Sequence, residues 1–261
     1  MQYRPEIDGL RAVAVLPVIL FHAGIHPFNG GYVGVDVFLV ISGFLITSLL
    51  INEVRQEGFS IGRFYERRAR RILPALFVVI IACLPVAYLW MLPKQLEDFS
   101  TSIVSVVLFL SNFYFLSQIS YFAPNAELQP LLHTWSLAIE EQYYLVIPLL
   151  LVGMRRSAIR TNALIIFLLV TASFTFSEWA WRENAERSFF FTLSRFWEIG
   201  VGSLCAFLAH GRKNSASNVL SALGLALILI PIFLFHEGIP FPSLYTLVPV
   251  LGTALIILFA G

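Results

Sequence analysis

The stretch Asp8-Gly-Leu-Arg11-Ala-Val-Ala-Val-Leu-Pro-Val-Ile-Leu-Phe-His22 is an apolar run with ionisable residues near its two ends. A charged side chain at membrane depth costs at least about 2.5–3.5 kcal/mol, so one that is retained faces a protein interior, a water-filled cavity or a partner. In a helix, the step from Arg11 to His22 rises about 16 Å and turns about 20° past three full turns. Both side chains therefore lie on one face, at different depths.

The composition is that of a polytopic membrane protein. Of the 261 residues, 58% are hydrophobic and only 13% are charged, and the mean hydropathy is +0.80. These values lie far outside those of an ordinary soluble domain. The net charge of +1 carries no information on partners, because in a membrane protein the sign of each loop matters more than the sum. We expect contact with membrane lipid and no nucleic-acid partner.

Apolar runs long enough for a membrane span, about 17–25 residues, recur along the chain. They predict an all-α fold, a polytopic membrane helix bundle with eight spans in one domain over residues 1–261. A ninth apolar run, residues 100–116, is interpreted as a re-entrant or interfacial helix. The predicted spans are residues 8–24, 34–51, 72–92, 136–153, 162–181, 189–209, 219–235 and 244–260.

Positive residues set the orientation of these spans. They gather in three connections, which the positive-inside rule places in the cytoplasm together with the N-terminus. This alternation requires that residues 100–116 do not cross; the alternative, a ninth ordinary span, sets two of the connections outside. The basic residues concerned are Arg55, Arg63, Arg67, Arg68, Arg70 and Arg71, then Arg155, Arg156 and Arg160, then Arg212 and Lys213.

His22 and Asp36 flank a short glycine-rich turn, where close backbone approach leaves room for a ligand. A histidine with a carboxylate neighbour suits general-base catalysis near neutral pH. Because Asp8 and Arg11 accompany it on the same helix, we interpret His22 as catalytic and Asp36 as a candidate partner. The alternative is an interfacial histidine at a helix end with no chemical role.

A second polar stretch, His133-Thr-Trp-Ser-Leu-Ala-Ile-Glu-Glu-Gln-Tyr-Tyr144, enters a predicted span. Residues three or four apart share one face of a helix. That spacing predicts an inward polar stripe, with a purely structural salt-bridge role for its acids as the alternative. The stripe consists of His133, Ser136, Glu140 and Tyr144.

Two further groups of charged residues have structural interpretations. Glu141 points away from the stripe and is expected to reach Arg195. Arg195 and Glu198 are three apart in a span and are interpreted as a structural intramembrane pair.

The basic run at residues 66–71 lies just before the third span and contains Arg67, Arg68, Arg70 and Arg71. Arginine offers bidentate geometry to phosphate oxygens, so this cluster is suited to hold the nucleotide end of a coenzyme. A positive-inside anchor or an anionic-lipid contact is the alternative.

Several common catalytic motifs do not occur in the sequence. There is no Gly-x-x-x-x-Gly-Lys-Ser/Thr loop, no Gly-x-Ser-x-Gly elbow and no His-Glu-x-x-His. Phosphate hydrolysis, elbow-type serine chemistry and zinc hydrolysis of that kind therefore have no motif support. The histidines are too scattered for a metal site, and no metal is predicted.

Three stretches together resemble the membrane acyltransferase-3 family, the bacterial O-acyltransferases of cell-surface glycans. The first is Arg11-x10-His22 followed by Gly30-Gly-Tyr-Val-Gly-Val-Asp-Val-Phe-Leu-Val-Ile-Ser-Gly-Phe-Leu45. The second is Arg-x-x-Arg in the basic run, and the third is His133-Thr-Trp-Ser-Leu-x-x-Glu-Glu-Gln-Tyr-Tyr. They cover the N-terminal two-thirds of the chain and are specific in combination.

The resemblance implies a bundle of about ten helices of about 20 residues each, acetyl-coenzyme A as donor on the cytoplasmic side, and transfer to a sugar hydroxyl outside. It also implies that Arg11 and the 67–71 cluster meet the coenzyme, and that His22 is catalytic with Glu140 as acidic partner. Acceptors in the family include lipopolysaccharide and peptidoglycan. The chain is expected in the bacterial inner membrane, truncated at its C-terminus. Its first 50 residues look closest to members with a C-terminal SGNH domain.

A transporter or flippase is the rival interpretation. In it, the intramembrane Arg11, His22, Glu140 and Arg195 form a substrate or proton pathway. Against it, the two halves of the sequence show no internal symmetry, and the charged groups cluster near the surfaces rather than at a midplane site.

Overall fold

Helices account for all the regular structure described. The computed structural model describes residues 4–54, 59–118, 129–211 and 216–261, and every regular element in those ranges is an α-helix or a short 3-10 helix. The all-α prediction is confirmed for these ranges. Of the basic residues used to orient the spans, Arg55, Arg212 and Lys213 lie outside them.

Each predicted span contains most of one α-helix, except that the span expected at residues 189–209 is divided at Phe191 between the end of α8 and α9. Short 3-10 helices at Gly31–Val33 and Leu244–Thr246 precede α2 and α11. The third helix starts well before the expected residue 72, because Ser60 caps it by accepting a hydrogen bond from the Arg63 backbone N–H at 3.3 Å. The helices are α1 (Pro5–His22), α2 (Gly34–Glu53), α3 (Ile61–Trp90), α4 (Pro93–Val107), α5 (Ser111–Gln118), α6 (Thr134–Gly153), α7 (Ile159–Glu183), α8 (Ala185–Phe190), α9 (Thr192–Ala209), α10 (Asn218–Leu234) and α11 (Leu247–Phe259).

Several helices are suited to a bilayer. Four segments of the described chain are long and apolar enough to cross a membrane: Gly31–Glu53, which contains α2, and the helices α3, α6 and α7. The helices α10 and α11 are apolar but shorter. The chain therefore has the helices of a multi-pass membrane protein, whereas the count of eight spans stays a prediction.

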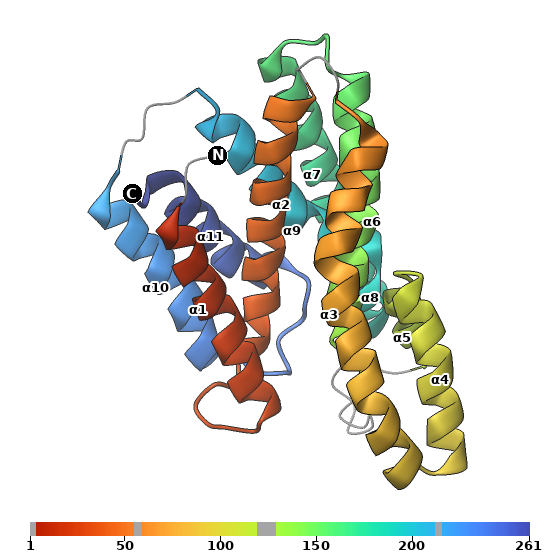
Figure 1. Cartoon of the computed structure of the whole chain (residues 1–261). Coiled ribbons are helices and arrows are strands. Elements are labelled where there is room, and N and C mark those ends of the chain that lie inside the picture. The colour runs from red at the N-terminus through yellow and green to blue at the C-terminus, as the bar shows by residue number, and fades with distance from the viewer. Residues whose placement is uncertain (1–3, 55–58, 119–128, 212–215) are drawn as a thin grey trace.

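The helices alternate in direction (Figure 1). In that view α1, α3, α7 and α10 run downward, and α2, α6, α9 and α11 run upward. The end of α2, the start of α3 and the α6–α7 connection accordingly share the upper end of the molecule. The connections at this end are the ones predicted to be cytoplasmic. This is the alternation that the positive residues require, whereas the side of the membrane on which that end lies stays a prediction.

The run at residues 100–116 differs from the expected single helix. It is divided between α4 and α5, which have 15 and 8 residues, and the break lies at Phe109, whose φ of 54° is left-handed. Both helices are shorter than the roughly 20 residues of a span. The expectation of a single helix is therefore wrong, whereas the re-entrant or interfacial placement stays a prediction. Both helices lie beside the lower half of α3 (Figure 1).

Close backbone contact between α2 and α9 forms the centre of the bundle. A Cβ atom added to Gly43 of α2 would lie 1.9 Å from the Ile199 carbonyl oxygen, and one added to Gly202 of α9 would lie 1.9 Å from the Val40 carbonyl oxygen. Only glycine allows this approach, which maximises van der Waals contact where helix association gains little from the hydrophobic effect.

A buried ionic cluster joins the same two helices near their lower ends. The Arg195 guanidinium of α9 lies 2.6 Å from the Asp36 carboxylate of α2 and 2.8 Å from the Glu198 carboxylate. Its Nε donates to the Phe189 carbonyl at 3.2 Å. The predicted Arg195–Glu198 pair is confirmed, and Asp36 is its unforeseen third member.

The α2–α9 contact predicts that Gly202→Ala is destabilising. The new methyl group meets backbone rather than a movable side chain, and overpacking of this kind costs about 1–3 kcal/mol. Thermal unfolding in mild detergent should show a lower melting temperature for this variant.

The matched control is Gly153→Ala in α6, where an added Cβ meets nothing within 4 Å. A melting temperature for Gly202→Ala equal to that of this control would contradict the proposed close contact.

Candidate active site

A cavity of about 680 Å³ lies among α1, α2, α3 and α6. It collects six of the residues that the sequence singled out, from segments more than 130 positions apart. It also contains Arg4 and Ser42, which the sequence did not suggest. The polar residues that line it are Arg4, Asp8, Arg11, Ser42, Arg68, Arg71, Glu140 and Tyr144.

Helical periodicity sorts the basic run into two faces. Arg68 and Arg71 are three apart and both line the cavity. Arg67 and Arg70, each one position earlier in the sequence, do not line the cavity. Arg67 pairs with Glu53, and Arg70 pairs with Glu66 at 2.7 Å on the surface. The predicted four-arginine cluster is thus divided, with two members on the cavity.

Arg68 is the most enclosed of the cavity arginines. Its guanidinium lies 4.4 Å from the centroid of the Tyr144 ring and 3.7 Å from the Glu141 carboxylate. The expectation that Glu141 reaches Arg195 is therefore wrong, because Glu141 faces α3 rather than α9. Within the described part of the chain, the buried Arg68 Nε has no hydrogen-bond partner. That N–H is a buried donor whose hydrogen-bonding capacity is unused.

Glu140 is a buried carboxylate at the cavity wall, 7% exposed. The Ser42 hydroxyl donates to one of its oxygens at 2.9 Å, and the Tyr144 hydroxyl donates to the other at 3.4 Å. Glu140 and Tyr144 are four apart on α6, so the predicted stripe is present at this level. Asp8 and Arg11 pair at 3.1 Å on the opposite wall.

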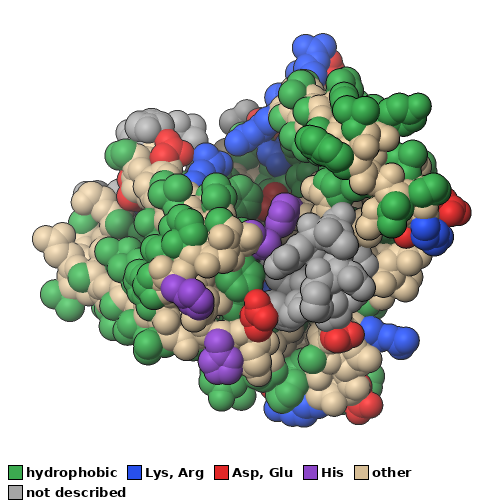
Figure 2. Space-filling model, turned by 90° about the horizontal axis from the view of Figure 1, so that it is seen from below, with side chains coloured by type: hydrophobic (Ala, Val, Ile, Leu, Met, Phe, Trp, Pro, Cys, Tyr) green, Lys and Arg blue, Asp and Glu red, His purple; other side chains and the backbone are tan. Residues whose placement is uncertain are grey.

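His22 ends α1 beside a second histidine. The centroids of the His22 and His133 rings are 4.5 Å apart, and the rings are nearly perpendicular. His22 Nδ1 lies 2.8 Å from the Val18 carbonyl oxygen. Since a carbonyl only accepts, Nδ1 carries the proton and Nε2 is the basic nitrogen of the neutral ring. Figure 2, which views the molecule from below, shows histidine side chains at the edge of a central hollow.

The two acids proposed as partners of His22 have other partners. Asp36 contacts Arg195, as described above, and Glu140 contacts Ser42. Glu140 also follows His133 by seven residues, which is about 10 Å along α6 on nearly the same face. The histidine pair and the buried carboxylate therefore lie at successive levels along α6, but neither His22 nor His133 lines the cavity. Ser136, between them, donates to the His133 carbonyl at 3.2 Å.

His133 precedes α6, and the pKa of its imidazole lies below the usual value. The main cause is partial removal of the ring from water, and the second is repulsion from a charged His22. Both effects disfavour protonation of His133 in the folded protein. In the described residues, no group of three histidine, cysteine or acidic side chains is arranged to hold a metal ion.

Sequence comparison assigns the family. A family model described as an acyltransferase domain, acyltransferase 3, matches residues 4–261. The chain belongs to the acyltransferase-3 family. The resemblance carried by Arg11, His22 and the two later motifs is confirmed, and no solved structure matches the chain.

Relatives of this acyltransferase-3 chain include longer proteins. It is 30% identical over 256 residues to a protein named membrane-bound transacylase BcsY, from Komagataeibacter xylinus, covering 98% of this chain and 64% of BcsY. It is 40% identical over 152 residues to the O-acetyltransferase OatA of Staphylococcus aureus, covering 58% of this chain and 25% of OatA. The match to an uncharacterised Haemophilus influenzae protein is 35% over 237 residues, covering 85% of this chain and 96% of that protein. The chain thus spans less than two thirds of BcsY and a quarter of OatA.

Two residues of the acyltransferase-3 site were missed at the sequence level. Arg4 lines the cavity while donating to the Ile257 carbonyl at 2.8 Å near the end of α11, a contact that no local pattern indicates. Ser42 lies in the most apolar part of α2, where a small hydroxyl side chain is normally interpreted as a packing residue. His133 was recognised as polar, but its contact with His22 was not.

The low pKa of His133 predicts a pH dependence of stability. The unfolded chain binds a proton at His133 more readily than the folded one, so stability falls as the pH drops through the unfolded value of about 6.5. His133→Asn removes this contribution. Melting temperatures of both proteins at pH 5 and pH 8 should show a smaller acid-induced decrease in the variant. Equal decreases would contradict this assignment.

Proposed function

We propose that this chain transfers an acyl group, most simply acetyl, from acyl-coenzyme A to a hydroxyl of a cell-envelope glycan on the other side of the membrane. The observation that carries the proposal is the cavity, which combines phosphate-suited arginines with the buried carboxylate of Glu140 on α6, the helix that His133 directly precedes. The names of BcsY and OatA, a transacylase and an O-acetyltransferase, support it. Family membership favours an enzyme over a transporter.

The donor phosphates are proposed to bind Arg68 and Arg71, with Arg11 deeper in the cavity. Arginine binds phosphate oxygens through paired N–H groups, and the buried Arg68 Nε has no partner in the described protein. The cavity volume of about 680 Å³ lies within the range of ligand pockets, roughly 300–1,000 Å³. On this proposal the arginine end faces the cytoplasm of a bacterial inner membrane, with the N-terminus on that side.

The chemical step is proposed to use His22 as general base. Nε2 accepts the proton of the acceptor hydroxyl while the hydroxyl oxygen attacks the thioester carbonyl. The carbon–sulfur bond breaks, and the coenzyme thiolate takes the proton back from the imidazolium, which yields an ester and a thiol. The Nδ1 contact with Val18 supports this role because it leaves the lone pair on Nε2. General-base help of this kind contributes about 10²–10⁴-fold.

Glu140 is proposed as a positioning residue on the route between the two ends. Its carboxylate is tied to Ser42 and Tyr144 and lies about two helical turns from His133. It keeps the interior polar at the level through which the pantetheine arm and its thioester must pass. A C-terminal SGNH domain, where the full-length protein has one, would receive or pass on the product.

The first test is transfer of label from radiolabelled acetyl-coenzyme A to envelope glycan in membranes that contain the full-length protein. Wild type should transfer label, and His22→Ala should reduce transfer at least about 100-fold. His210→Ala is the matched control, because His210 follows α9 at the other end of the bundle. Wild-type activity in His22→Ala, with the protein present at equal level, would exclude His22 as the base.

A second test separates the two faces of the basic run. Arg68→Gln should raise the KM for acetyl-coenzyme A about tenfold or more, because a charge-assisted hydrogen bond is worth roughly 1.5–3 kcal/mol. Arg70→Gln, which removes only a surface pair with Glu66, should leave KM nearly unchanged. Equal effects of the two substitutions would show that the cavity does not bind the donor phosphates.

A further inference from the structure

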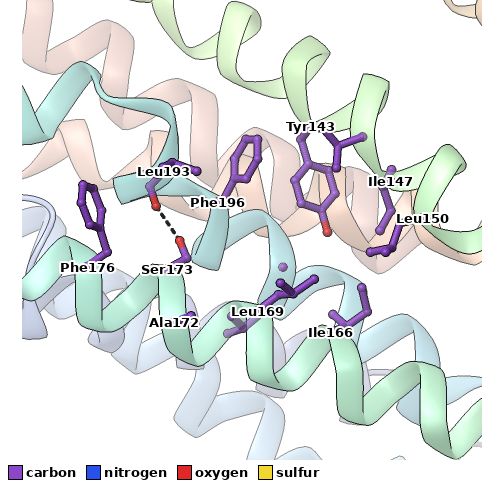
Figure 3. A pocket seen from close by; sticks show the side chains of 13 residues that line it. Tyr143, Ile147, Leu150, Ile166, Leu169, Ala172, Ser173, Phe176, Leu193 and Phe196 are labelled. Atoms are coloured by element: carbon purple, nitrogen blue, oxygen red, sulfur yellow. Dashed lines mark hydrogen bonds between the residues drawn. The ribbon is translucent and has the colours of Figure 1, made fainter.

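A second cavity lies on the other side of α6. Although α6 and α7 are consecutive helices, they barely touch, since α7 packs mainly on α9. An apolar groove of about 410 Å³ lies in the wedge between them. Figure 3 shows side chains of α6 and α7 along its two sides, with Leu193 and Phe196 of α9 between them. It shares no lining residue with the candidate active site.

The polar groups at this groove are satisfied within the protein. The Ser173 hydroxyl donates to the Leu193 carbonyl at 2.6 Å and accepts from the Trp197 backbone N–H at 2.9 Å. The Tyr143 hydroxyl is bonded to the Ser203 hydroxyl at 2.7 Å. The groove therefore offers an apolar wall, which water wets poorly and a hydrocarbon chain fills well.

The groove opens sideways, toward the region of the bilayer. Val146, Leu169 and Leu193, one from each of the three helices, line it and are each about half exposed. A flexible chain of a surrounding lipid can thus enter without any helix moving apart.

Positively charged side chains lie at the connection between the two helices that form the walls of the groove. Arg155, Arg156 and Arg160 are exposed at the α6–α7 connection, and none of them forms an ion pair within the described residues. Arg155 comes just after the end of α6 at Gly153, in the same connection that follows the groove residue Leu150. It also lines a small pocket beside α2 and α9. Basic side chains above a gap between membrane helices are suited to hold anionic lipid head groups.

We propose that the α6–α7 groove is a binding site for one anionic phospholipid. An acyl chain occupies the groove, and the phosphate of the head group lies against the arginines of the α6–α7 connection. The occupant is a lipid rather than a protein helix, because an apolar slot beneath unpaired cations matches a molecule that is apolar below and anionic above. The proposal is independent of acyl transfer.

The proposed site bears on the geometry of α6. Glu140 and Tyr144 lie on one face of that helix and line the active-site cavity. Tyr143 and Ile147 lie on the neighbouring face and line the groove. A chain in the groove supports α6 from behind, at the place where its packing on α7 is missing.

The test is native mass spectrometry of the full-length protein in mild detergent. The protein is titrated with dioleoyl phosphatidylglycerol, which is anionic, and with dioleoyl phosphatidylcholine, which has the same chains and no net charge. We expect one phosphatidylglycerol to bind per chain at least about tenfold more tightly than phosphatidylcholine.

Two variants address the two halves of the site, each with a matched control. Ala172→Trp fills the groove and should abolish the tight binding, whereas Leu168→Trp on the lipid-facing side of α7 outside the groove should not. The triple change of Arg155, Arg156 and Arg160 to glutamine should weaken phosphatidylglycerol binding at least about tenfold. The control with the same charge change is the triple replacement of Lys94, Arg182 and Arg187 by glutamine, which should retain it.

Three results would overturn the proposal. Equal affinity for the two lipids would show that the arginines of the α6–α7 connection do not bind the head group. Unchanged tight binding in a folded Ala172→Trp protein would place the lipid elsewhere. A dimer that Ala172→Trp disrupts and phosphatidylglycerol does not displace would make the groove a protein interface.

Discussion

Arg195 places a full positive charge between α2 and α9 with 1% of its surface exposed. A guanidinium keeps its charge in proteins, so a buried one is tolerated only when its donors are matched by acceptors. Carboxylates from α2 and α9 and the Phe189 carbonyl supply them, and the ring of Trp135 lies 5.4 Å from the guanidinium carbon. The beginnings of α2, α6 and α9 are thereby held to one group.

The histidine pair depends on that arrangement. Trp135 is in the first turn of α6, two residues after His133, and Asp36 is in the first turn of α2, close in sequence to the turn that follows His22. The cluster around Arg195 therefore holds the start of α6, next to His133, against the start of α2, which follows the turn after His22. We therefore regard the buried cluster as the support of the candidate site rather than as part of its chemistry.

The close approach of α2 and α9 has a second consequence. Because Gly43 and Gly202 let these helices touch along their backbones, they leave no space for a ligand between them. The space appears instead where helices are held apart: the polar cavity on one side of α6 and the apolar groove on another. The character of each space follows from the residues that face it, with arginines and a buried acid in the first and aliphatic and aromatic side chains in the second.

The sequence by itself determined the helical class, the positions of most helices and the local pairs. Apolar run length places helices, and residues three or four apart on one helix meet, so Arg195 with Glu198 and Glu140 with Tyr144 were predictable. The break at Phe109 was not, because the whole run at residues 100–116 is apolar enough to read as one helix.

Only the tertiary structure decided the contacts between distant segments. Asp36 meets Arg195, Glu141 meets Arg68, and His22 meets His133, over separations of more than 70 residues. Helical periodicity gives the face on which a residue lies, but not the helix that covers that face. Which helix covers a face depends on which backbones can approach each other. In this protein the glycines of α2 and α9 and the buried charge of Arg195 determine that α2 and α9 pack together.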